Sequence, residues 1–141
     1  MNAPLYTIAI LRLAAELPAP VVLERVDGAA ERRSPTCGSK VRTEVALDDA
    51  GRVAALSQTV QACAFGQASA SVLAAGAVGR TRDEVAQAIE NLRDWLAAKR
   101  DDPGVWPGLD ALAPARSRTG RHGAIILPFE TLLGAMKAAR A

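Results

Sequence analysis

Apolar and polar residues alternate between Lys40 and Leu47, a pattern typical of a strand with one buried face. The predicted buried face carries Val41, Thr43, Val45 and Leu47. The turn-forming residues 48–51, Asp-Asp-Ala-Gly, follow, so residues 52–62 are expected to return as an antiparallel partner strand. These two segments predict a central hairpin.

A third, shorter strand is expected before the hairpin. Residues 21–34 contain extended and β-branched stretches, interrupted by the turn signal Asp27-Gly28. We place the end of this strand at Ser34-Pro35. The sheet would then have about three strands.

Four other segments show the spacing of apolar residues that is typical of helices. The predicted helices cover approximately residues 4–16, 65–77, 81–96 and 124–139. The third begins with a capping box, Thr81-Arg82-Asp83-Glu84, and Pro128 is expected in the first turn of the last. Residues 101–120 are expected to form a loop with one short helical turn at 109–112.

These elements predict an α+β fold, in which a small antiparallel sheet of about three strands is covered on one side by helices. The chain has 141 residues, half of them hydrophobic and 23% charged. This length suits one compact domain with its own core, so we expect residues 1–141 to form a single domain.

The two cysteines, Cys37 and Cys63, are expected at the same end of the hairpin. Cys37 lies in a turn before the first hairpin strand, and Cys63 ends the second strand where a helix begins. A helix N-terminus favours the thiolate, the form that binds metals and attacks sulfur. The pair therefore points to metal or sulfur chemistry, although a small buried residue is the simpler interpretation of Cys63 alone.

Charge and segment composition exclude several classes of function. A net charge of +2 is too mild for a nucleic-acid-binding face. Arg12 interrupts the first apolar run, so neither a secretory signal nor a membrane span fits. We expect a cytoplasmic protein, in which the cysteines are free or bind a metal rather than form a disulfide.

Two motifs carry a family resemblance. The sequences Ser-Pro-Thr-Cys-Gly-Ser at 34–39 and Ala-Cys-Ala-Phe-Gly-Gln-Ala-Ser-Ala-Ser at 62–71 flank the hairpin. Together they resemble the iron–sulfur cluster assembly scaffolds of the IscU/NifU N-terminal type, with SufU as the most similar branch. The resemblance implies the SufE/NifU-like fold, a cysteine desulfurase as partner, and an iron–sulfur cluster, iron or zinc at the cysteines.

The chain departs from the family pattern at two ligand positions. The family's aspartate position is Ser39, and its third cysteine position is Ala124. One chain thus offers half of a four-ligand site. The alternatives are a third ligand from His122, a homodimer in which each chain gives two thiolates, or a form that binds no metal.

We therefore predict a scaffold-like protein or sulfur acceptor and not an enzyme, with Cys63 or Cys37 receiving persulfide sulfur. Arg116, Arg118 and Arg121 would dock the desulfurase, although a solvated loop explains them equally. One alternative is a degenerate paralogue that acts as a metal-free interaction or regulatory module. Another is a desulfurase stimulator that binds zinc through Cys37, Cys63 and His122.

Overall fold

The computed structural model of the chain describes residues 6–35 and 38–139. Three strands form one antiparallel sheet in the order β1-β2-β3. The strands are β1 Gly28–Arg33, β2 Lys40–Leu47 and β3 Val53–Gln61. Lys40 pairs with Gln61 at one end of the hairpin, and a bulge lies between Ala46 and Leu47 at the other. The predicted three-stranded sheet and both ends of the first hairpin strand are confirmed.

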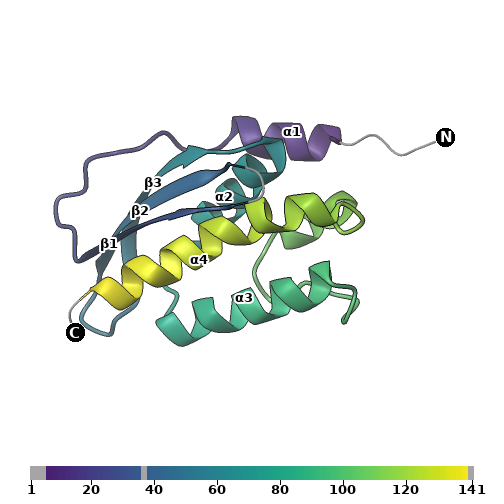
Figure 1. Cartoon of the computed structure of the whole chain (residues 1–141). Coiled ribbons are helices and arrows are strands. Elements are labelled where there is room, and N and C mark those ends of the chain that lie inside the picture. The colour runs from purple at the N-terminus through teal and green to yellow at the C-terminus, as the bar shows by residue number, and fades with distance from the viewer. Residues whose placement is uncertain (1–5, 36–37, 140–141) are drawn as a thin grey trace.

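Helices cover one face of this sheet (Figure 1). α4, His122–Ala138, contacts β1 and β2, and α2, Ala64–Ala77, contacts β3 and α4. α3, Arg82–Leu96, packs on the side of α4 away from the sheet, and α1, Ile8–Ala15, packs on α2. The architecture is the predicted α+β class. No helix in the described ranges is long and apolar enough to cross a lipid bilayer.

Trp106 closes the core from the loop after α3. Its indole Nε1 donates a hydrogen bond to the carbonyl of Val72, 3.1 Å away. Its ring meets Phe129 edge-on, with 5.1 Å between ring centroids. Both tryptophans, Trp95 and Trp106, are buried, as expected for packing residues. The loop then forms a 3₁₀ helix over Leu109–Ala115, longer than the predicted single turn.

The predicted break at Asp27-Gly28 is a bend at Asp27 alone, because Gly28 is already the first residue of β1. A Cβ at this position would lie 2.1 Å from the carbonyl oxygen of Ala135 in α4. Asp27 joins the start of the strand to the end of β2, since its carboxylate accepts the N–H of Leu47 at 2.7 Å. The glycine is thus required by close helix–sheet packing and not by a turn.

Pro128 also lies deeper in its helix than predicted. α4 begins at His122, so Pro128 is its seventh residue and cannot donate to the carbonyl of Ala124. Side chains donate hydrogen bonds to backbone carbonyls near Pro128. The Ser69 hydroxyl donates to Ile125 at 2.5 Å. α4 continues through Pro128 while it packs against the sheet, α2 and α3.

The predicted capping box at the start of α3 is present. It makes the free energy of unfolding depend on pH. Thr81 Oγ1 accepts the N–H of Glu84 at 3.2 Å, and the Glu84 carboxylate accepts the N–H of Thr81 at 3.0 Å. The bond from the Thr81 N–H is the main reason that the pKa of Glu84 is held below its ordinary value, assisted by Arg80 and Arg52. The ionised form of Glu84 therefore stabilises the fold.

We expect Glu84→Gln to lower the free energy of unfolding at neutral pH. A lowered folded pKa gives stability that is present above the unfolded pKa and is lost as pH falls through the folded one. The difference in the free energy of unfolding between the variant and wild type should therefore shrink when urea unfolding is measured at pH about 3. Glu90→Gln, on an exposed position of the same helix, is the control. An unchanged difference at both pH values would contradict the interpretation.

Candidate functional site

Cys63 joins the end of β3 to the start of α2. It is the N-cap residue, with φ −68° and ψ 174°, and its carbonyl accepts the N–H of Gln67 at 2.9 Å. The side chain is half-buried, the thiol is free, and the sulfur makes no capping bond. The predicted position at a helix N-terminus is therefore confirmed.

Cys37 lies outside the described residues, but the turn that contains it is fixed at both ends. The N–H of Ser34 donates to the Ser39 carbonyl at 2.9 Å, and the N–H of Gly38 donates to the Ser34 carbonyl at 3.2 Å. β2 then begins at Lys40, opposite Gln61. Because Gln61 lies two residues before Cys63, both cysteine motifs meet at one end of the sheet. The distance between the two sulfurs stays a prediction.

The position of the absent third cysteine also faces this region. Ala124 lies in the first turn of α4 and is 1% exposed. Its Cβ is 3.5 Å from the place that a Cβ on Gly66 would occupy, and Gly66 is in the first turn of α2, three residues after Cys63. A buried methyl group therefore stands where the family resemblance predicts a thiolate. Ser39, at the predicted aspartate position, is also buried.

His122 holds a loop in place. Its Nε2 lies 3.0 Å from the carbonyl oxygens of both Ala115 and Arg116. Carbonyl oxygens only accept, so Nε2 carries the proton and only Nδ1 retains a lone pair for a metal. Within residues 6–35 and 38–139, no three His, Cys, Asp or Glu side chains are close enough to hold a metal ion.

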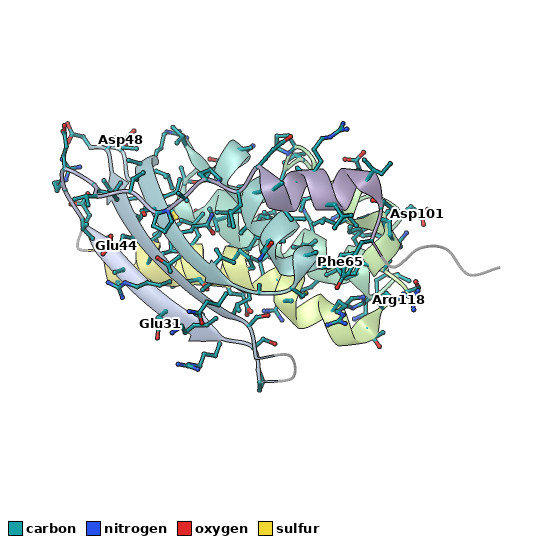
Figure 2. All side chains as sticks on the ribbon, turned by 90° about the horizontal axis from the view of Figure 1, so that it is seen from above. Glu31, Glu44, Asp48, Phe65, Asp101 and Arg118 are labelled. Carbon is teal, nitrogen blue, oxygen red and sulfur yellow. The ribbon has the colours of Figure 1, made fainter. Side chains whose placement is uncertain are left out.

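The three predicted docking arginines differ in their exposure and contacts. The Arg116 guanidinium donates to the carbonyls of Trp95 at 2.9 Å and Arg100 at 3.2 Å, and it lies 5.1 Å from the centre of the Trp95 ring. Arg118 is exposed (Figure 2), and Arg121 is partly exposed. Arg116 thus bonds within the chain while it stays partly exposed, and docking by the three arginines stays a prediction.

Two supporting contacts were not predicted from the sequence. The Gln67 amide donates to the Ala62 carbonyl at 3.1 Å, which braces the residue before Cys63. The Tyr6 ring packs on Phe65 with 5.2 Å between centroids, so the segment before α1 contacts the start of α2. The first contact could have been found from the sequence, because Gln67 lies only four residues after Cys63. The second depends on tertiary packing alone.

Known proteins share both the sequence pattern and the fold. The family model of the NifU-like N terminal domain matches residues 18–102. A nitrogen-fixing NifU-like protein (N-terminal) from Brucella abortus is 29% identical, with a TM-score of 0.87 over 95% of this chain and 93% of that one.

Two further solved structures share the fold. A putative iron–sulfur cluster assembly scaffold protein for the SUF system from Fervidobacterium islandicum is 20% identical, with a TM-score of 0.83 over 94% of this chain and 96% of that one. A hypothetical protein is 18% identical, with a TM-score of 0.69 over 92% of this chain and 97% of that one. No curated protein sequence matches the chain.

The variant His122→Phe tests whether His122 is a metal ligand or a hydrogen-bond donor that holds the loop. It keeps a ring but removes the N–H donor. We expect a loss of about 1–3 kcal/mol in the free energy of unfolding, since two carbonyls lose their shared donor. Zinc bound per chain should not change, as measured by elemental analysis after loading. Unchanged stability with loss of bound zinc would instead support the ligand role.

Proposed function

Because the chain belongs to the family of NifU-like N-terminal domains, we propose that it acts as an iron–sulfur cluster assembly scaffold-like protein or sulfur acceptor. One observation carries the proposal. Cys63 begins α2 at the end of the sheet where the 34–39 turn, which contains Cys37, also closes. Two thiols that are close together would suit the transfer and holding of sulfur and iron.

The sulfur donor would be the persulfide of a cysteine desulfurase. The thiolate of Cys63 or Cys37 attacks the terminal sulfur of that persulfide, and a new S–S bond forms. The donor's S–S bond breaks, and the donor cysteine leaves as a thiolate. Sulfane sulfur moves without net oxidation or reduction, so the chain accepts cargo and catalyses no turnover of its own.

The cargo on the cysteines would be an iron–sulfur cluster or iron, with zinc as the second candidate. Clusters in proteins are commonly held by four cysteine thiolates, and this chain has two. We propose that two copies each supply Cys37 and Cys63 to one bridging cluster. The buried methyl of Ala124, which offers no donor atom, supports a ligand from a second copy over a third ligand from the same helix position.

The serine at position 39 and the alanine at position 124 favour one alternative function. A chain that has lost its third and fourth ligands can keep the fold and bind the family's partner without metal. In that case it would act as an interaction or regulatory module, and neither thiol would be needed for binding.

Sulfur transfer tests the scaffold proposal directly. Incubation with a cysteine desulfurase and cysteine should add the mass of one sulfur to the wild-type chain, seen by intact mass spectrometry. Cys63→Ser or Cys37→Ser should reduce this adduct, and the double variant should abolish it. The Brucella abortus NifU-like domain is a parallel sample for comparison. No sulfur on the wild-type chain under conditions that load that sample would contradict sulfur acceptance.

Ala124→Cys should restore part of a metal site. Ala124 faces the first turn of α2, so a thiol there would approach Cys63. We expect zinc affinity to rise at least about tenfold in a competition assay with a chromogenic chelator, because a third thiolate joins the set. Ala135→Cys, a buried position near the other end of α4, is the matched control. Equal gains in both variants would show adventitious thiol binding.

A further inference from the structure

The β1–β2 hairpin places two positive charges directly opposite each other at the end that leads into the 34–39 turn. Arg33 of β1 pairs in register with Lys40 of β2. Directly opposite side chains in an antiparallel pair have Cβ atoms about 4.5–5.5 Å apart, and like charges there destabilise the sheet. Neither cation forms an ion pair with an acidic residue of the described ranges.

The rest of this sheet face carries two acidic residues, Glu31 and Glu44, and one basic residue, Arg42. Glu31 lies opposite Arg42, and an Arg42 guanidinium nitrogen is 3.3 Å from a Glu44 carboxylate oxygen. In Figure 2 the sheet is seen in front of α4, with Glu31 and Glu44 labelled along it. The unbalanced positive charge is therefore confined to Arg33 and Lys40. Such a local repulsion destabilises the fold and would be relieved by a ligand of opposite charge.

These cations lie on the open face of the sheet. Val41 and Thr43 are buried against the helices, so the alternation along β2 turns Lys40 and Arg42 outward. Arg33 is exposed and Lys40 is half-buried. Lys40 also pairs with Gln61 of β3, so the charged end lies beside the chain that leads to Cys63. A partner bound here would lie at the edge of the candidate site.

The chemistry of the face favours an acidic protein segment over a nucleic acid. Both phenylalanines and both tryptophans of the chain are buried in the core, and Tyr6 packs on Phe65. This face therefore has no aromatic ring on which a base could stack. Glu31 and Glu44 would also repel a continuous phosphate backbone, whereas a short carboxylate-rich segment needs only the charged end.

We propose that Arg33 and Lys40 together form a docking surface for a carboxylate-rich segment of a partner protein. A carboxylate can accept two parallel bonds from the Arg33 guanidinium while the Lys40 ammonium lies beside it. Bound carboxylates would relieve the repulsion between the two cations. The inference does not depend on metal or sulfur at Cys63, so its test uses the metal-free chain.

The probe is a fluorescently labelled hexaglutamate peptide, titrated with the full-length chain at low ionic strength and followed by anisotropy. Lys40→Glu and Arg33→Glu should each weaken binding at least about tenfold, because each turns an attraction for carboxylates into repulsion. Lys99→Glu makes the same change of charge on an exposed residue beyond α3 and should leave most of the binding intact. Lys40→Glu should also shift the urea unfolding midpoint upward, since opposite charges replace like ones.

Three results would overturn the proposal. The first is no binding of the peptide by the wild-type chain. The second is equal weakening by Lys99→Glu, which would show a response to net charge alone. The third is tighter binding of a single-stranded DNA oligomer of the same charge, also lost in Lys40→Glu, which would assign the surface to nucleic acid. None of these outcomes bears on sulfur transfer to Cys63.

Discussion

The close approach of α2 and α4 is the constraint on which the candidate site depends. A Cβ on Gly66 would lie in ordinary contact with α4, 3.5 Å from the Cβ of Ala124, and the Ser69 hydroxyl donates to the Ile125 carbonyl at 2.5 Å in the buried interface. This contact fixes the start of α2, and with it Cys63, against position 124. Glycine is required at position 66 by Ala62, because a Cβ there would lie 2.6 Å from the Cβ of Ala62. Small residues in α2 thus set the geometry of the site.

The sequence predicted those features that are encoded locally. Alternation located β2 to the residue, the Thr81–Glu84 box located the start of α3, and the small-residue run located α2 directly after Cys63. Each of these signals depends on neighbours within a few positions along the chain. The family resemblance, which rests on the two cysteine motifs, was confirmed by the family match and by the fold.

Features that depend on tertiary packing could not be predicted in this way. Gly28 resembles a turn residue in the sequence, yet its role is to admit a carbonyl of α4. Pro128 looks like a helix start, but packing supports a helix that already began six residues earlier. Arg116 belongs to a basic run, yet its guanidinium turns inward onto Trp95. In each case a partner distant in sequence decides the role.

The chain thus combines a NifU-like fold with an altered set of candidate ligands. Cys63 keeps its position at the helix start, while a buried methyl occupies position 124 and a serine occupies position 39. Ala124 lies against the first turn of α2, which directly follows Cys63, although it has no donor atom. Cargo binding would then rest on two thiolates per chain, and the open end of the sheet beside them would be reached by an acidic partner.

The content of iron, zinc and acid-labile sulfide per chain, measured after oxygen-free purification of wild type and Cys63→Ala, tests this account most directly. We expect metal or sulfide in the wild type, near half a cluster per chain if two copies share one, and its loss in the variant while the fold remains intact by circular dichroism. Metal-free wild-type protein that stays unloaded after incubation with iron and sulfide, or with zinc, would contradict the scaffold role.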